Sequence, residues 1–266
     1  MTQVSPPDPV VDVLLCPVCR DGLTRSDGAL RCPAGHAFDI ARQGYVNLLG
    51  RADGDTAAMV ADRVAFLAAG HYAPLARKLA EWAADRAPGL VVDAGAGTGY
   101  YLDAVLARGG FGLALDASPV ALRRAARAHE RIGAAVWDVW RPWPVRDGAA
   151  AVVLNVFAPR NGPEFHRVLR PDGTLLVVTP TEAHLAELGT AAGLLSVDPR
   201  KPARLAETLA RFERVRNETL SYPMTLTAAD VRRVIGMGPA AHHDPVGLDE
   251  GREVTASFQV SAYRPG

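Results

Sequence analysis

Short apolar segments alternate with amphipathic segments along most of the chain. Continuous apolar runs occur at residues 90–93, 112–116, 134–137, 149–154 and 175–179. Runs of this length, bounded by glycine, proline and charged residues, are typical of strands that are buried on both faces of a parallel sheet. Segments with helical spacing lie before and between them, for example at residues 100–108. The pattern therefore predicts an α/β fold with a Rossmann-like, doubly wound sheet.

The flanking segments predict further elements around this sheet. Hydrophobic residues at helical spacing predict one helix from an N-cap at Asp55 to Gly70 and a second over residues 74–85. Residues 169–174 are expected to form a turn into the fifth strand, and residues 180–185 to open another helix. Thr227 and Asp230 have the spacing of a capping box. Alternating apolar residues over 254–262 predict a closing strand.

All three cysteines of the chain lie near its start, in the pattern C-x2-C-x12-C-x3-H. Cys16, Cys19, Cys32 and His36 offer the four thiolate and imidazole ligands of a tetrahedral zinc site. An Asp-Gly pair inside residues 23–30 predicts a hairpin turn between them. Because about 40 residues cannot build a sizeable core, we expect Zn²⁺ to hold this segment together. The alternative is three buried thiols whose spacing is a coincidence.

Composition excludes several classes of protein. The chain has 29 basic (Lys, Arg) and 29 acidic (Asp, Glu) residues, so a strongly non-specific nucleic-acid binder with a large basic excess is not expected. No run reaches the ~18 apolar residues of a membrane span, and the first residues lack the features of a signal peptide. Cysteines at metal-ligand spacing fit a reducing compartment. We therefore expect a cytoplasmic protein with no membrane contact.

Two arginine-rich stretches are interpreted as solvated helix faces, with RNA contact as the alternative. The first contains Arg123, Arg124, Arg127 and Arg131. The second contains Arg200, Lys201, Arg204, Arg211, Arg214 and Arg216.

A glycine-rich loop follows the first of the predicted buried strands. Asp93 precedes residues 95–99, which read Gly-Ala-Gly-Thr-Gly, and such a loop lets a ligand approach the backbone closely. Asp116 ends the next strand at the spacing of a carboxylate that accepts both ribose hydroxyls. Asp138 follows the third strand and could accept from an adenine amino group. Because an acid directly before the loop suits a cationic amino acid moiety better than a pyrophosphate, S-adenosylmethionine is favoured over NAD.

The fourth strand runs into residues suited to handling a nucleobase. The Asn155 carbonyl could orient a ring or exocyclic nitrogen, and Phe157 could stack on an extruded base. The alternative is an ordinary loop whose proline starts a helix. His184 is a candidate cofactor contact, although a lone histidine is more often a surface residue.

Motifs at residues 36–39, 43–49, 66–72, 99–101, 157–159 and 222–224 complete the picture. Together they resemble the RlmA family of 23S ribosomal RNA (guanine-N1)-methyltransferases, over nearly the whole chain. The resemblance implies a class I methyltransferase sheet behind a small N-terminal zinc ribbon, with zinc at the four ligands given above. It implies cofactor contacts at Tyr72, Gly95, Gly97, Thr98, Gly99, Tyr100, Tyr101, Leu102 and His184.

The resemblance also implies a substrate and a partner. Family substrates are guanines in a hairpin of domain II of 23S rRNA, and the Gram-positive class, which includes a tylosin-resistance enzyme, acts near nucleotide 748. The alanine- and arginine-rich composition favours that class. Asn155 and Arg160 are then expected to stabilise negative charge that spreads to guanine O6. A homodimer is expected from the family.

We therefore divide the chain into a zinc-binding RNA-recognition domain, residues 1–50, and an S-adenosylmethionine-dependent methyltransferase domain, residues 51–266. The predicted function is methylation of a guanine N1 in 23S rRNA that confers resistance to tylosin-like macrolides. Two alternatives stay open. One is a small-molecule methyltransferase with a structural zinc ribbon, and the other is a non-catalytic zinc module that binds RNA.

Overall fold

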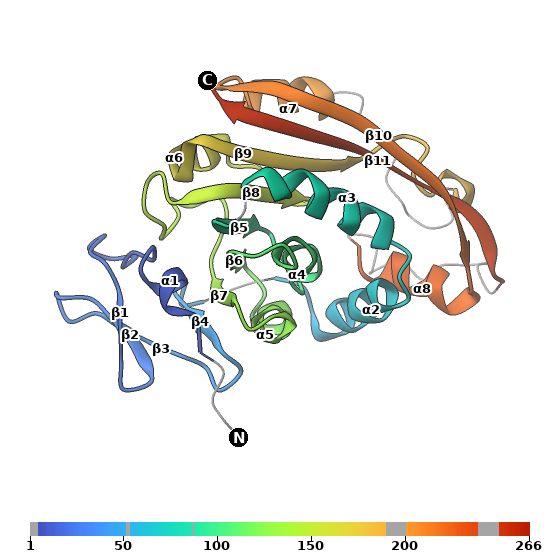
Figure 1. Cartoon of the computed structure of the whole chain (residues 1–266). Coiled ribbons are helices and arrows are strands. Elements are labelled where there is room, and N and C mark those ends of the chain that lie inside the picture. Colours follow the sequence, from blue (N-terminus) through green and yellow to red (C-terminus); the bar gives the residue numbers. More distant parts are fainter. Residues whose placement is uncertain (1–4, 52–53, 87, 190–200, 239–249) are drawn as a thin grey trace.

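The computed structural model describes the chain except residues 1–4, 52–53, 87, 190–200 and 239–249. Its centre is an eight-stranded sheet in the order β10-β11-β9-β8-β5-β6-β7-β4 (Figure 1). Neighbouring strands from β4 to β9 run parallel, whereas β11 is antiparallel to both β9 and β10. The strands are β4 (Tyr45–Asn47), β5 (Leu90–Ala94), β6 (Phe111–Asp116), β7 (Ile132–Val136), β8 (Ala150–Val156), β9 (Leu169–Pro180), β10 (Phe212–Leu226) and β11 (Arg252–Pro265).

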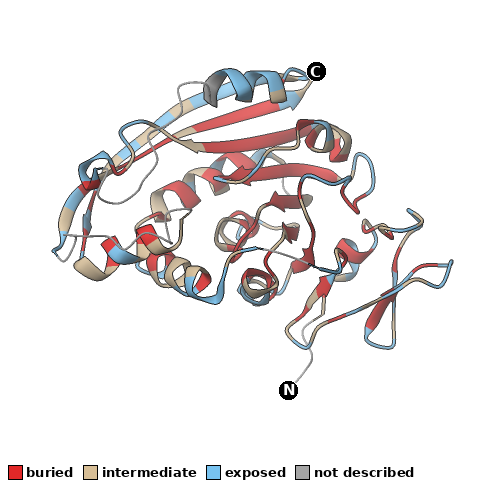
Figure 2. Cartoon of the chain, turned by 180° about the vertical axis from the view of Figure 1, so that it is seen from behind, coloured by how far each residue is buried: buried red, intermediate tan, exposed pale blue. Residues whose placement is uncertain are grey.

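The strand order reverses at β5, the strand that leads into the glycine loop. β5 pairs with β6 on one side and with β8 on the other, so the chain winds outward in both directions from it. Doubly wound sheets bind ligands outside the carboxyl ends of their strands at such a point. The five predicted buried strands are confirmed as β5 to β9, and Figure 2 shows that most of their residues are buried.

Two hydrophobic cores cover the two faces of the sheet. The first core includes residues of α2 (Ala57–Ala68), α3 (Ala73–Ala83), α4 (Tyr100–Leu106), α5 (Pro119–Ala128) and α8 (Ala228–Gly236). The second includes residues of α1 (Asp8–Val11), α6 (Gly162–Val168), the N-terminal ribbon and Leu205 of α7 (Lys201–Thr208). Short 3-10 helices occur at η1 (Ala84–Arg86) and η2 (Ala186–Leu188). The described part of the chain has no helix long and apolar enough to cross a membrane.

The N-terminal ribbon is a three-stranded antiparallel sheet of β1 (Thr24–Ser26), β2 (Ala29–Arg31) and β3 (Ala37–Asp39). Asp27 and Gly28 both have positive φ, as the predicted hairpin turn requires. The ribbon shares the second core with the main sheet, because Cys16 and Leu30 belong to the same cluster as Leu113. The following strand β4 pairs in parallel with β7 at the edge of the main sheet.

The structure corrects four local expectations. The N-cap of α2 is Thr56, whose side chain accepts from the Met59 N–H, and not Asp55. Residues 169–174, expected as a turn, begin strand β9, and the register with β8 shifts there. Residues 180–185 open no α-helix; turns lead instead to η2. Arg214 and Arg216 lie on strand β10 rather than on a helix, while Arg200 lies outside the described residues.

Candidate functional site

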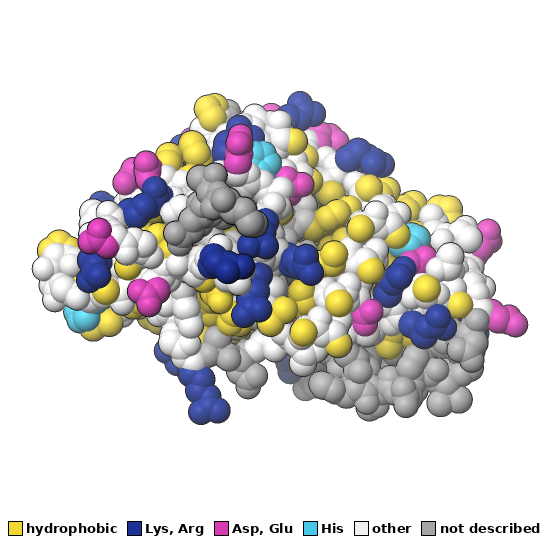
Figure 3. Space-filling view, turned by 90° about the horizontal axis from the view of Figure 1, so that it is seen from below, with side chains coloured by type: hydrophobic (Ala, Val, Ile, Leu, Met, Phe, Trp, Pro, Cys, Tyr) yellow, Lys and Arg dark blue, Asp and Glu magenta, His cyan; other side chains and the backbone are white. Residues whose placement is uncertain are grey.

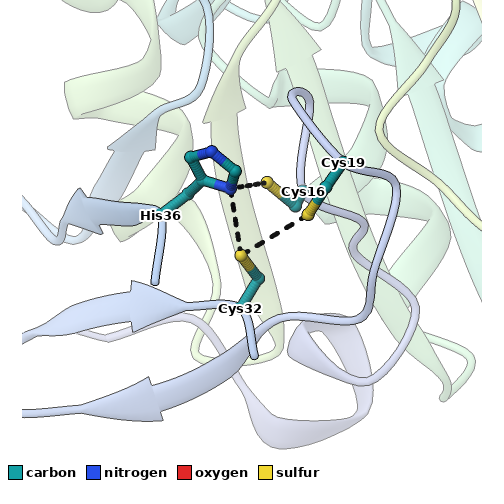
Figure 4. A group of neighbouring side chains, drawn as sticks. All are labelled: Cys16, Cys19, Cys32 and His36. Carbon is teal, nitrogen blue, oxygen red and sulfur yellow. Dashed lines mark hydrogen bonds between the residues drawn. The ribbon is translucent and has the colours of Figure 1, made fainter. Parts of the chain in front are cut away.

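The four predicted metal ligands meet in one cluster within the ribbon (Figure 4). Their ligand atoms all lie within 4.8 Å of one another. Nδ1 of His36 is 3.6 Å from Sγ of Cys16 and 3.3 Å from Sγ of Cys32, and the Sγ atoms of Cys19 and Cys32 are 3.5 Å apart. Gly35, at φ 87°, provides the tight turn between Cys32 and His36.

This cluster fits a structural zinc ion. With Zn–S bonds of about 2.3 Å, the edges of a tetrahedron are about 3.8 Å long, close to the observed separations. The cysteines form no disulfide, so all three sulfurs can act as thiolate ligands. Four protein ligands fill a tetrahedron and leave no position for a reacting water, so the site is structural rather than catalytic.

A cavity of about 600 Å³ opens at the carboxyl ends of β5, β6 and β7. Asp93, Asp116 and Asp138, from three successive strands, all line it. The predicted residues Tyr72, Gly95, Gly97, Thr98, Tyr100, Tyr101 and Phe157 also line it. The structure therefore brings the acids, the glycine loop and the predicted stacking residue together at one site.

Asp93 is a buried acid at the floor of this cavity, only 2% exposed. Burial, and secondarily the nearby Asp116, raise its pKa to about 8. No hydrogen bond reaches its carboxylate from the described residues. A buried carboxylate without partners is unfavourable on its own, so this position favours a ligand that brings a positive charge or a donor group.

Asp116 lies beside Asp93 but is already held by the backbone. One carboxylate oxygen accepts from the Gly97 N–H at 2.8 Å and the other from the Ser118 N–H at 2.8 Å. Burial raises the pKa of Asp116, and the two N–H groups oppose that shift. Each oxygen keeps a second lone pair, so this fixed carboxylate can accept one hydroxyl per oxygen, as a ribose diol requires.

Two glycines of the loop, Gly95 and Gly99, leave no room for a side chain. A Cβ at Gly95 would lie 2.4 Å from Cβ of Ala158, and one at Gly99 would lie 3.0 Å from Cα of Ala125. Both glycines have φ of 79°. The loop therefore needs glycine here for its conformation and its packing, and it presents backbone rather than side chains to the cavity.

Aromatic side chains form one wall of the cavity. The ring of Phe157 is 41% exposed and packs against Phe258, Tyr72 and Tyr101, with centroids 5.4, 6.2 and 6.3 Å away. Phe157 has φ of 55°, an unusual backbone conformation for a non-glycine residue that directs this ring. The exposed ring therefore offers a stacking surface.

His184 lies behind Tyr72 and holds its hydroxyl. Its Nε2 is 3.1 Å from the Tyr72 hydroxyl, and its Nδ1 accepts from the Ser257 N–H at 3.2 Å. Because Nδ1 is an acceptor, the proton of the neutral ring lies on Nε2 and is donated to Tyr72. Burial lowers the pKa of His184 to about 4, which keeps the ring neutral. The Tyr72 hydroxyl then keeps its own proton for donation elsewhere.

Five predicted site residues do not line the cavity. Gly99 and Leu102 lie just behind the loop, and His184 lies behind Tyr72. Asn155 is fully buried beneath the floor, where its amide donates to the carbonyls of Pro159 at 2.8 Å and Ala94 at 3.4 Å. Arg160 lines a second, separate depression. Asn155 thus ties the two loops of the floor together, and Arg160 is turned away from the acids.

Several cavity residues were not predicted from the sequence. Leu49, Arg51, Gly54, Asp55 and Met237 line it, although residues 50–54 read as a simple polar linker. The parallel pairing of β4 with β7 brings this linker to the carboxyl edge, and three residues are too short a strand to predict. Trp140, which lines the cavity with 64% of its surface exposed, was also missed.

Comparisons with known proteins agree with this geometry. Residues 14–50 match the model of the RlmA N-terminal zinc ribbon. A 23S rRNA (guanine(748)-N1)-methyltransferase of Streptomyces fradiae is 52% identical, over 96% of this chain and 98% of that protein. A protein of Micromonospora griseorubida assigned as a 23S rRNA (guanine-N1)-methyltransferase is 54% identical, over 95% of this chain and 97% of its own.

The fold agrees as well. A solved methyltransferase in complex with the Haloferax volcanii Trm112 methyltransferase activator is similar, with a TM-score of 0.52 and 18% sequence identity, over 81% of this chain and 99% of that chain. The two proteins therefore share a fold, and the three acids at the carboxyl edge of the sheet fit S-adenosylmethionine. The chain belongs to the RlmA family of 23S rRNA (guanine-N1)-methyltransferases.

Proposed function

We propose that this protein transfers a methyl group from S-adenosylmethionine to N1 of a guanine in a domain II hairpin of 23S rRNA, near nucleotide 748. The observation that carries the proposal is the meeting of three acids from successive strands with an exposed aromatic ring in one cavity. The S. fradiae relative, 52% identical, supports the target nucleotide.

Each acid fits one part of the cofactor. Asp116, held by two backbone N–H groups, accepts the ribose hydroxyls. Asp138 lies further along the cavity, where its carboxylate accepts from the Trp140 N–H at 3.0 Å, and it accepts from the adenine amino group. Asp93, buried and without partners among the described residues, faces the positively charged end of the cofactor. When bound, the cofactor supplies an electrophilic methyl group on its sulfonium.

The acceptor base enters beside Phe157. A guanine inside a hairpin must leave its stack before N1 can reach a methyl donor, and an exposed aromatic ring can receive the base it exposes. N1 must also release its proton to the surrounding water, because the protonated nitrogen has no lone pair for attack. Asn155 positions the loop that carries Phe157 by binding the Pro159 carbonyl. Close placement of donor and acceptor then supplies much of the rate.

A basic face close to the cavity suits the RNA backbone. Helix α5 begins just after Asp116 and Ala117, which line the cavity, and its exposed side carries Arg123, Arg124 and Arg127. At about 1.5 Å per residue, these arginines lie about 6–12 Å along the helix from its start. Figure 3 shows Lys and Arg side chains gathered near the middle of this lower face. Guanidinium groups bind phosphates well, so the face fits the flanking RNA.

Methyl incorporation into three classes of substrate tests the proposal. The purified protein is incubated with labelled S-adenosylmethionine and naked 23S rRNA, assembled large subunits or a panel of small metabolites. We expect the label to enter RNA, as 1-methylguanosine in the domain II hairpin, and not the small metabolites. Expression in a sensitive host should also raise tolerance to tylosin-like macrolides. Incorporation into small metabolites with none into RNA would instead support a small-molecule enzyme.

A further inference from the structure

Trp140 stands between the cofactor cavity and a second depression. It lines both, and 64% of its surface is exposed. Its backbone is fixed, since its N–H donates to Asp138 at 3.0 Å. A large aromatic side chain held at a boundary between two hollows can present a face to a ligand that extends from one into the other.

The second depression is smaller and carries more basic than acidic side chains. It has a volume of about 360 Å³ and is lined by Arg160 and Arg211, with Glu207 as its acid. Nε of Arg160 is buried and has no hydrogen-bond partner in the described part of the chain. Arg211 is exposed, and its side chain makes no hydrogen bond with the described residues. A partly buried guanidinium without a partner is costly unless a ligand satisfies it.

We propose that this depression holds the nucleotide next to the target guanine, with its base stacked on Trp140 and its phosphate bound by Arg160 and Arg211. The inference deepens the proposed function and rests on it. A nucleotide combines the two features that the depression matches, since bases stack on aromatic rings and phosphates bind guanidinium groups. One short loop then serves both nucleotides, because Phe157 and Arg160 are three positions apart.

Modified hairpins test the inference against matched variants. The substrates are the domain II hairpin and four modified forms. Two carry an abasic site, one on each side of the target guanine, and two carry a neutral methylphosphonate, one at each flanking linkage. For the wild type, the abasic site on one side of the guanine, but not on the other, should lower kcat/KM about tenfold to a hundredfold, the range for loss of one stacked base. The neutral linkage on that same side should also lower kcat/KM. Trp140→Ala should lose a similar factor on the intact hairpin and become insensitive to the abasic site. Trp140→Phe should recover most of the rate.

Arginine variants test the phosphate contact. Arg160→Gln and Arg211→Gln should become less sensitive to the neutral linkage. Arg108→Gln is the control, because Arg108 is exposed and follows α4, which runs away from the cavity edge. Equal sensitivity of wild type and Trp140→Ala to every abasic site would overturn the inference. So would a matching loss of S-adenosylmethionine affinity in Trp140→Ala by calorimetry, since Trp140 would then belong to the cofactor site. Absence of guanine methylation by the wild type would contradict the proposed function itself.

Discussion

Asp93 and Asp116 share one cavity but differ in what already holds their carboxylates. Two backbone N–H groups hold Asp116, whereas Asp93 is buried with no partner among the described residues. Asp116 is therefore held in place to accept hydrogen bonds from a ligand. Asp93 is unfavourable to ionise until a cationic ligand binds beside it.

Replacing Asp116 by alanine should weaken S-adenosylmethionine binding by about 1.5–3 kcal/mol, the scale of hydrogen bonds to a charged group. Calorimetry with the purified protein measures the change. Asp85→Ala is the control, because Asp85 is an exposed acid of η1 outside the cavity. Unchanged affinity in Asp116→Ala would remove this carboxylate from the cofactor site.

Asp93 should make the stability of the ligand-free protein depend on pH. Its pKa is raised to about 8 in the folded state and is about 3.9 when unfolded. Between these values the folded state binds more protons than the unfolded state, so the free energy of unfolding falls as pH rises through the window. Urea unfolding at about pH 6 and about pH 8 should show a smaller fall in Asp93→Asn than in the wild type. Equal falls would show that Asp93 is ionised without cost.

For single residues, the sequence predicts which chemical groups form a site better than the direction in which each side chain points. The three acids and the four metal ligands could be predicted because each stands at a spacing that a strand end or a metal turn imposes. The direction of Arg160 could not, because it depends on the packing of the loop after β8 against α6 and α7. The role of His184 behind Tyr72 likewise depends on its bond to Ser257, which is 73 residues away in sequence.

In the glycine loop, both the backbone conformation and the close packing require glycine. Gly95 and Gly109 both have positive φ, but only Gly95 has a close neighbour, Ala158, at the position of an added Cβ. Gly95→Ala should therefore lower the free energy of unfolding by about 1–3 kcal/mol more than Gly109→Ala, because overpacking adds to the backbone strain. Denaturant unfolding of the two variants measures the difference. Equal losses would show that Ala158 moves aside freely.

Zinc bound in the ribbon is expected to stabilise the strands and helices that pack against the ribbon. Cys32→Ser should lose zinc and lower the melting temperature of the whole chain, because Cys32 belongs to the same core as the main sheet. Hairpin RNA binding should be lost, while S-adenosylmethionine affinity should change by less than about tenfold, or 1.4 kcal/mol. Metal analysis measures the zinc content and thermal unfolding the melting temperature, and calorimetry with the hairpin and with S-adenosylmethionine measures the two affinities. Freshly purified wild type without zinc would contradict the metal site.

The sequence predicts strands well where both faces of the strand are buried. It predicts them poorly where a strand depends on pairing with a distant part of the chain. The central strands β5 to β8 have unbroken apolar runs and could be predicted. Strand β10 is mostly exposed on the far edge, and its pairing with β11 joins Phe212 to Pro265. Its charged residues resemble a solvated helix face, because an edge strand with one open side shows no continuous apolar run.

Across the whole molecule, the ribbon and the sheet share one hydrophobic core. Strand β4 joins the ribbon to the edge of the sheet, and the next residues form a rim of the cofactor cavity. This arrangement places the ribbon against the sheet edge whose carboxyl end opens into the cavity. This placement fits the proposed substrate, because a large, structured RNA can reach the ribbon and the cavity together. Ribosomal RNA is the substrate class in the names of the relatives.

We propose that guanine N1 in a domain II hairpin receives the methyl group. Primer extension on 23S rRNA from a sensitive host that expresses the protein checks this assignment, because a methyl at N1 blocks the Watson–Crick edge. We expect a stop one nucleotide before the guanine near position 748, absent in cells that express Asp116→Ala at an equal level. Read-through across the whole hairpin, from a host with soluble and zinc-loaded wild-type protein, would show that this guanine is not methylated at N1.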